Sequence, residues 1–273
     1  MSAPDDSDLL AGWTQTWWQA IDDFTTLLED LDEAEWDTPT DLAGWDVRAV
    51  ASHVAHLEQV LASGVEEHAE VGEPPHATGL MNLYTEIGVV NRREASPDAI
   101  INEIRSAATT RRTALLADPP SDAAAAPERS FGGVPWSWGT LLRNRPLDVW
   151  MHEQDVRRAT GRPGGLDSAA AQHTIEYLSE SMGYVLAKKA GAPAGTTLVL
   201  EVEGCEPTAF AVGDDGRGRP VAAPATPTLA LGMDRDTFVR LVGGRCAAEP
   251  GAVRVEGDQE LAARVLDQMA TTP

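Results

Sequence analysis

The sequence predicts a protein of two parts, a helical bundle followed by a small α+β module. Apolar residues recur every three or four positions over most of the first 190 residues, as on one face of an amphipathic helix. From about residue 192 apolar and polar residues alternate instead, which is typical of strands. The length of 273 residues also favours two parts, because single cores rarely grow much beyond about 250 residues.

Six helices are expected in the first part. They cover residues 8–31, 47–62, 80–90, 97–116, 137–160 and 168–190. Asp46 and Ser96 stand where helix N-caps belong, directly before an apolar run and before a proline. Pro146 lies inside the helix that begins near Ser137, so this segment is either one kinked helix or two shorter helices that meet there.

The tryptophans of the first part are expected to be structural. Trp13 and Trp17 follow the apolar stripe of the first helix, which predicts packing in the core. Trp45, just before the second helix, is expected to pack on Val50 as a hydrophobic staple. Residues 118–135 are rich in proline and glycine and predict a loop, with a short hairpin or a lid over a site as alternatives.

The second part should contain four strands and two helices. The alternating segments cover residues 196–204, 207–213, 227–233 and 252–258, and the helices begin after Asp234 and Asp258. We therefore expect domains at residues 1–191 and 192–273. Cys205 and Cys246, far apart and outside any CxxC spacing, are expected to be small buried hydrophobic residues.

Charge and composition exclude several classes of partner. Forty-three acidic residues against 21 basic ones give a formal net charge of -22, which should repel nucleic acids and anionic membranes. No apolar run approaches the roughly 20 residues of a membrane span, and the N-terminus lacks the pattern of a signal peptide. We expect a reduced, cytoplasmic protein that acts on small molecules, as a monomer or a homodimer.

A candidate metal site arises from polar residues inside the segment RNRPLDVWMHEQDVRRATG, residues 143–161. At about 3.6 residues per turn, Arg145, Asp148, His152 and Asp155 fall on one face of a helix. The spacing of Asp148 and His152 lets a carboxylate and an imidazole reach one point from successive turns, as metal ligands on helices do. His53, on the second helix, is the available third ligand.

Two imidazoles and one carboxylate favour Zn²⁺ over Mg²⁺ or Ca²⁺, with Ni²⁺, Fe²⁺ and Mn²⁺ left open. Arg145 and Asp155 are the candidate catalytic residues beside this metal. Arg145 either holds a substrate carboxylate or forms a salt bridge with Asp148.

The order of these features resembles the mycothiol-dependent maleylpyruvate isomerase family. The resemblance rests on LAGWDVRAVASHVAHL, which leads to His53, on the acid-x-x-x-His-x-x-Asp pattern from Asp148 to Asp155, and on DTFVRLVGGR with VEGDQELAARVL in the tail. Together these segments span nearly the whole chain. The resemblance implies a DinB-like four-helix bundle that holds a divalent metal, followed by a C-terminal sterol-carrier-like α+β domain.

The resemblance also implies that His53, Asp148 and His152 bind the metal. Asp148 stands where the family usually has glutamate, one methylene longer, and Asp155 should orient His152. The resemblance further implies a low-molecular-weight thiol cofactor, mycothiol, and the isomerisation of a small electrophile or the transfer of the thiol to it. The alternative is a non-catalytic ligand-binding or sensing module that a metal stabilises.

Overall fold

The computed structural model describes residues 5–272 of the chain. It divides into two compact units, with the boundary between Ala170 and Ala171. The first unit is helical, and the second contains a five-stranded sheet with helices. The expected fold class, a helical bundle followed by an α+β domain, is therefore confirmed.

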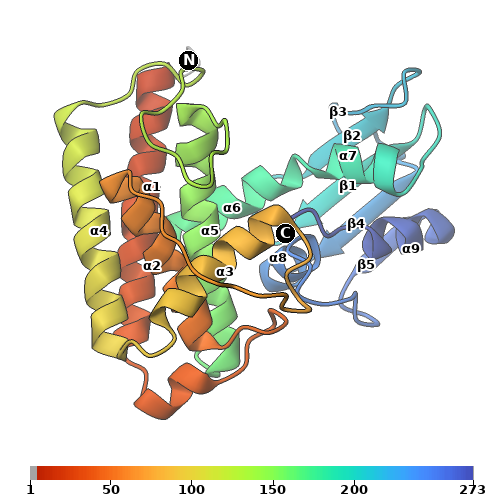
Figure 1. The fold of residues 1–273 in the computed structure, drawn as a ribbon. Helices are drawn as coiled ribbons and strands as arrows, with labels where there is room; N and C mark the ends of the chain where they lie inside the picture. Colours follow the sequence, from red (N-terminus) through yellow and green to blue (C-terminus); the bar gives the residue numbers. More distant parts are fainter. Residues whose placement is uncertain (1–4, 273) are drawn as a thin grey trace. The chain divides into compact units, whose positions relative to one another are not determined.

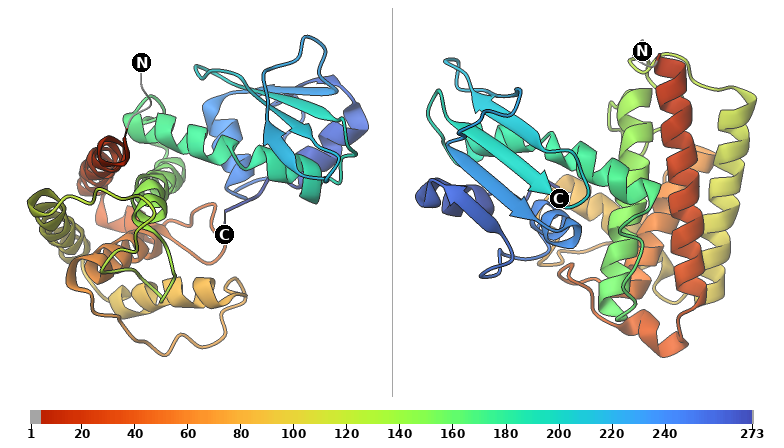
Figure 2. Two further views of the ribbon diagram at one scale, coloured as in Figure 1. Left: turned by 90° about the horizontal axis from the view of Figure 1, so that it is seen from above. Right: turned by 180° about the vertical axis from the view of Figure 1, so that it is seen from behind.

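Four long helices form the bundle of the first unit, and they lie side by side in Figures 1 and 2. They are α1 (Asp6–Glu29), α2 (Val47–Ser63), α4 (Pro97–Ala117) and α5 (Trp138–Ala159). The shorter helix α3 (Leu80–Arg92) packs against α2, and a 3-10 helix, η1 (Glu33–Asp37), follows α1. All the long helices that the periodicity predicts in this unit are present.

The helix boundaries follow the expected caps. The Asp46 side chain accepts a hydrogen bond from the backbone N–H of Ala49 at 2.8 Å, and Ser96 accepts one from Ala99 at 3.3 Å. Pro146 lies within the single helix α5, so the alternative of two separate helices is wrong. Residues 118–135 form no strand, which excludes the hairpin alternative for this loop.

The bundle core is built around large aromatic side chains. Trp17 of α1, Trp36 of η1 and Trp150 of α5 are fully buried. Trp13 is only partly buried, and the guanidinium of Arg143 lies 5.9 Å from the centre of its ring. The core assignment holds for Trp17, whereas Trp13 lies at the edge of the apolar stripe.

The single helix expected at residues 168–190 is broken in the structure. It consists of α6 (Ala169–Ser179), the single turn α7 (Met182–Tyr184) and a π-helical turn η2 (Val185–Lys189). The hydroxyl of Ser181 donates to the carbonyl of Leu178, and such side-chain bonds compete with helix continuation. Helix α7 packs against the strands β2 (Thr208–Val212) and β3 (Gly218–Pro220), and the second compact unit begins at Ala171, within α6. The sequence leads one to expect the start of this part at residue 192.

The second unit contains a mixed sheet of five strands in the order β3-β2-β1-β4-β5. Its strands are β1 (Thr197–Val202), β2 (Thr208–Val212), β3 (Gly218–Pro220), β4 (Leu229–Met233) and β5 (Arg254–Gly257). β1 and β4 are parallel, and the other neighbours are antiparallel. The expected helices are α8 (Arg235–Val242) and α9 (Gln259–Asp267).

Strand β3 is the one strand that the alternation did not predict. It is a short edge strand of sequence Gly-Arg-Pro, and glycine and proline there carry no alternating apolar signal. Cys205 and Cys246 are half-buried, so the expectation that they are buried is wrong. Both lie in loops, where their side chains are not enclosed by the sheet and helices.

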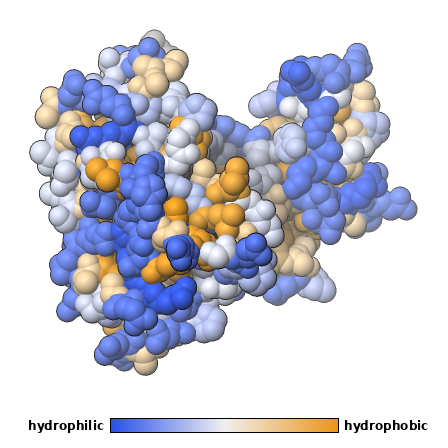
Figure 3. Space-filling model, viewed as in Figure 1, coloured by the Kyte–Doolittle hydropathy of each residue, from blue (hydrophilic) through white to orange (hydrophobic). Residues whose placement is uncertain are grey.

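The face of the molecule drawn in Figure 3 is largely hydrophilic, as the acidic composition leads one to expect. Within residues 5–272, none of the helices combines the length and the apolar character needed to cross a membrane.

Candidate metal centre

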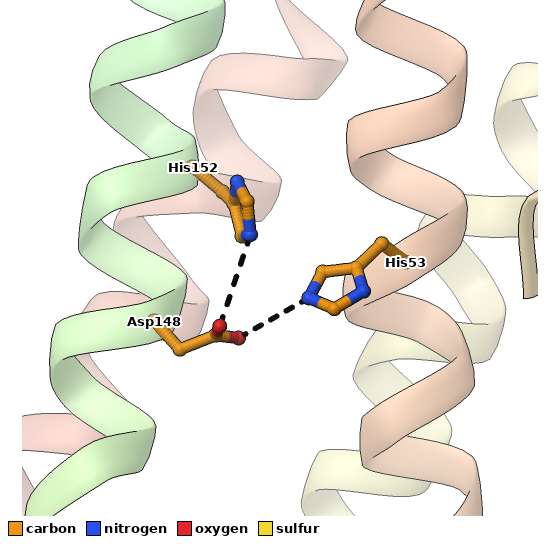
Figure 4. Close-up of side chains that lie close together, drawn as sticks. All are labelled: His53, Asp148 and His152. Atoms are coloured by element: carbon orange, nitrogen blue, oxygen red, sulfur yellow. Dashed lines mark ion pairs between the residues drawn. The ribbon is translucent and has the colours of Figure 1, made fainter. Parts of the chain in front are cut away.

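Helices α2 and α5 are neighbours in the bundle, and between them they bring His53, Asp148 and His152 together (Figure 4). His53 Nε2 lies 3.6 Å from Asp148 Oδ2, and His152 Nε2 lies 3.8 Å from Asp148 Oδ1. The two imidazole ring centres are 4.8 Å apart with their planes at 73°. One potential ligand atom from each residue lies within 4.8 Å of the others. We call these three residues the triad.

The triad is largely buried, but part of it is exposed to solvent. His53 and His152 are buried, whereas the side chain of Asp148 is 22% exposed. Asp148 is therefore the most exposed side chain of the triad.

Asp155 lies beside His152, the residue that the sequence leads one to expect it to orient. Its Oδ2 lies 3.2 Å from His152 Nδ1, and its Oδ1 accepts a hydrogen bond from Arg158 at 2.6 Å. A carboxylate at Nδ1 favours the proton on that nitrogen, so Nε2, which faces Asp148, keeps its lone pair. Asp155 is fully buried.

Arg145 takes the salt-bridge arrangement and not that of a substrate anchor. Its Nη1 donates to Asp148 Oδ2 at 2.8 Å, while Nε and Nη2 donate to Glu58 Oε1 at 3.1 and 2.7 Å. The Arg145 side chain has no exposed surface. Since three of its nitrogens already hold carboxylates inside the core, we assign it to positioning Asp148.

The charge of Arg145 sets the protonation of Asp148. Burial raises the pKa of Asp148, but the positive charge of Arg145 and the hydrogen bond with His53 outweigh this effect. The net result is a pKa far below the ordinary value for aspartate. Burial is also the main cause that lowers the pKa of His53, against the opposing effect of Asp148. A charged carboxylate and a neutral imidazole are the forms that bind metal ions.

Glu58 is a site residue that sequence reasoning missed. It is fully buried on α2, where it accepts hydrogen bonds from Arg145, from Arg111 of α4 and from the indole N–H of Trp17 at 2.9 Å. A signal was present in the sequence, since Glu58 lies four residues after Val54 on the same apolar stripe. A glutamate on an apolar stripe indicates that it has a buried partner of opposite charge, but the sequence does not show which residue that partner is.

Trp45 forms one wall of the site. The centre of its indole ring lies 5.2 Å from that of His53 and 6.0 Å from that of His152. The indole N–H donates to Glu86 of α3 at 2.5 Å, and His76 contacts the same carboxylate oxygen at 2.8 Å. Trp45 was expected as a staple on Val50, but the structure places its ring against the two histidines.

Gly44 lets the loop before α2 lie close to His76. Its φ of +81° lies in the left-handed region that favours glycine, and a Cβ atom there would overlap the ring of His76. The loop before α2, the His76 segment and α3 therefore meet beside the triad.

The triad fits a divalent ion by its donor set and its spacing. Four-coordinate zinc, with ligands at about 2.0–2.2 Å, separates its ligand atoms by roughly 3.3 Å. The separations of 3.6 and 3.8 Å go to different oxygens of Asp148, and with one ligand atom from each residue the separations stay within 4.8 Å. The three side chains would therefore have to close slightly around a bound ion. Among residues 5–272 the triad is the one group of His, Cys, Asp and Glu side chains with ligand atoms gathered in this way.

Replacing Asp155 with asparagine should weaken metal binding without removing it. The amide holds the His152 ring less firmly and withdraws the negative charge behind it, and changes of this kind lower metal affinity by about 10- to 100-fold. Competition with a chromophoric chelator measures the affinity. Asp8→Asn, on the exposed first turn of α1, is the matched control. Equal metal affinity of the Asp155→Asn variant and wild type would show that Asp155 does not contribute to metal binding.

The first unit is a four-helix bundle that holds a His-Asp-His triad, and the same chain contains a small unit with a mixed sheet. These features define a class of two-part proteins with a candidate metal centre. The family model for the mycothiol maleylpyruvate isomerase N-terminal domain matches residues 17–157, and the model for the MDMPI C-terminal domain matches residues 172–264. The chain belongs to the mycothiol-dependent maleylpyruvate isomerase family.

Solved structures agree with this fold. A crystal structure of the mycothiol-dependent maleylpyruvate isomerase is similar with a TM-score of 0.55 and 17% identity, over 90% of this chain and 92% of that one. A crystal structure of a histidine-to-alanine mutant of that enzyme gives 0.55 and 18% over the same shares. At these identities the likeness shows the fold. No curated protein matches the sequence significantly.

Proposed function

We propose that this protein is a metal-dependent enzyme that uses a low-molecular-weight thiol, mycothiol or a close analogue, to isomerise a small electrophilic substrate or to add the thiol to it. The observation that carries the proposal is the convergence of His53, Asp148 and His152 in a chain of this family. The donor set favours Zn²⁺ among the divalent ions.

The proposed roles follow from the contacts. His53 and His152 would bind the ion through Nε2 and Asp148 through its carboxylate. A bound divalent ion would hold a thiol as thiolate near neutral pH, below the ordinary thiol pKa of about 8.5. Asp155 fixes the His152 ring, Arg145 holds Asp148, and Trp45 shields one side of the triad from water.

The thiol would come from a small molecule. Both cysteines of the chain, Cys205 and Cys246, lie in the sheet-containing unit, and the unit that carries the triad has none. We further expect the protein to act in the cytoplasm, as a monomer or a homodimer.

The test is turnover of maleylpyruvate and of general electrophiles by native, metal-stripped and zinc-reconstituted protein, each with and without mycothiol. The expected result is turnover that needs both the thiol and the metal. Stoichiometric metal without thiol-dependent turnover of any substrate would favour a metal-stabilised binding or sensing module. Equal turnover by metal-stripped and native protein would show that the reaction does not need the metal.

Replacing Asp148 with glutamate should retain or tighten metal binding. Glutamate is the residue that the family resemblance implies here, and its extra methylene lengthens the reach of the carboxylate from α5 toward the imidazoles. Chelator competition measures the affinity, with Asp148→Ala as the variant that lacks a ligand. Loss of the metal in Asp148→Glu would show that the site requires the shorter side chain of aspartate.

A further inference from the structure

A cavity of about 430 Å³ lies in the helical unit, between α2, α4, α5 and the loop that follows α4. Its apolar lining includes Leu61 of α2, Leu115 of α4 and Leu141 of α5, all of them buried. No triad residue lines it. Leu61 and Leu141 are displaced from the triad by about 10–12 Å along their helices, at 1.5 Å per residue. The cavity is therefore separate from the candidate metal centre.

The polar feature of this cavity is a buried arginine. Arg111 of α4 lies in its wall, and only 5% of its side chain is exposed. The guanidinium carbon lies 4.5 Å from the centre of the Trp17 ring, and Nη1 donates to Glu58 Oε2 at 3.3 Å. Its Nη2 is buried and has no hydrogen-bond partner among residues 5–272. Burial lowers the pKa of Arg111 to about 10, so the side chain is charged at neutral pH.

Glu58 leaves the charge of Arg111 only partly matched. The same carboxylate receives two shorter hydrogen bonds from Arg145, at 2.7 and 3.1 Å. Glu58 is thus shared between two buried guanidinium groups, and Arg145, but not Arg111, lies three residues from a second carboxylate, that of Asp148, with which it pairs at 2.8 Å. A guanidinium carries five N–H donors in a planar fork that suits a carboxylate, and leaving buried donors unpaired is unfavourable.

We propose that this cavity is a second ligand site, which binds a small monocarboxylate with an apolar body. The carboxylate pairs with Arg111, and the body packs on Leu61, Leu115 and Leu141. Apolar walls with one buried charged anchor, here Arg111, are typical of small-molecule sites.

Charged residues at the exposed side of the cavity restrict which ligands can bind. Asp118, Asp122 and Glu128 line it and are exposed, so they repel a second negative charge at the outer end of a ligand. Arg129, the basic residue among them, donates a hydrogen bond to the backbone carbonyl of Ala62. The site should therefore prefer a monocarboxylate to a dicarboxylate of similar length.

The test is titration calorimetry of the metal-loaded full chain with 4-phenylbutyrate. We expect saturable binding, and binding at least about tenfold weaker for 4-phenylbutanamide and 4-phenylbutylamine, because a charge-assisted hydrogen bond contributes more than a neutral one. Adipate, a dicarboxylate, should also bind more weakly. Absence of 4-phenylbutyrate binding, or equal binding of the amide, would overturn the proposal.

Variants identify where the ligand binds. Arg111→Gln should weaken 4-phenylbutyrate binding by about tenfold or more. Arg112→Gln is the matched control, since Arg112 is the next residue of α4 but stacks on Trp18 and does not line the cavity. Ala114→Trp places a large ring in the cavity wall and leaves the arginine in the sequence, and it should block binding even if Arg111→Gln fails to fold.

His152→Ala separates this site from the metal centre. The cavity site should bind 4-phenylbutyrate with unchanged affinity in that variant. If His152→Ala abolishes binding while Ala114→Trp retains it, the carboxylate binds at the triad and the proposal is wrong. Because the readout is binding and not turnover, the result does not depend on the proposed enzymatic function.

Discussion

His152→Ala should lose its bound metal ion, and its thiol-dependent activity should fall by more than about 100-fold, beyond the range seen when only an outer partner of a metal ligand is changed. Two remaining ligands, His53 and Asp148, rarely hold a catalytic ion against buffer. Elemental analysis gives the metal content, and steady-state turnover with mycothiol gives the activity. His53→Ala should behave in the same way.

The controls for this prediction are a histidine outside the triad and the fold itself. His68 is exposed and lies in the segment between α2 and α3, so His68→Ala should keep both metal and activity. The helical content of His152→Ala should stay near that of wild type, because the apolar stripes of the bundle are unchanged. Retention of a full complement of metal in His152→Ala would exclude the triad as the metal site.

Glu58→Gln should lower the free energy of unfolding by about 3–5 kcal/mol, the range measured when one partner of a buried ion pair is removed. The glutamine leaves Arg145 and Arg111 in the core without the charge that both of them contact. Urea unfolding followed by the circular dichroism of the helical unit measures the change. Glu29→Gln, which removes an exposed partner of Arg105, should unfold close to wild type. Equal stability of Glu58→Gln and wild type would mean that the buried pair contributes nothing.

The effect of Glu58→Gln should depend on pH. Burial raises the pKa of Glu58, but the charges of Arg145 and Arg111 outweigh burial and hold it below the ordinary value of 4.5. A carboxyl group whose pKa is lower in the folded state stabilises the fold above its unfolded pKa, and this stabilisation is lost as the pH falls through the folded value. The difference between wild type and Glu58→Gln should therefore be constant above about pH 5 and shrink in acid.

Sequence reasoning predicted the parts of the site that depend on spacing within one helix. Asp148 and His152 are one helical turn apart, and Asp155 follows His152 at the next turn, so their shared face can be read from the chain. The third candidate ligand, His53, lies on another helix, so it was proposed as the available histidine and the resemblance to a family then supported that choice. The same logic succeeded for the long bundle helices, whose apolar periods and caps are local.

The parts that were missed depend on contacts between segments far apart in the chain. Glu58 and Arg111 lie on different helices, and neither carries a local sign of its partner. The pairing of Arg145 with Asp148 could be read from their spacing, but its contact with Glu58 could not. Trp45 was assigned to a contact within one turn because its partner Glu86 lies 41 residues away. Strand β3 exists because β2 offers it an edge, not because its own sequence favours a strand.

The most direct test of the central claim is the metal content of the full chain, purified without chelator and dialysed against metal-free buffer. The account predicts about one divalent ion per chain in wild type, as in a mononuclear site with two imidazoles and a carboxylate. It predicts much less than one in His53→Ala and His152→Ala, and an unchanged value in His68→Ala. Wild-type protein without stoichiometric metal, after reconstitution with Zn²⁺ has also failed, would contradict the assignment of His53, Asp148 and His152 as a metal centre.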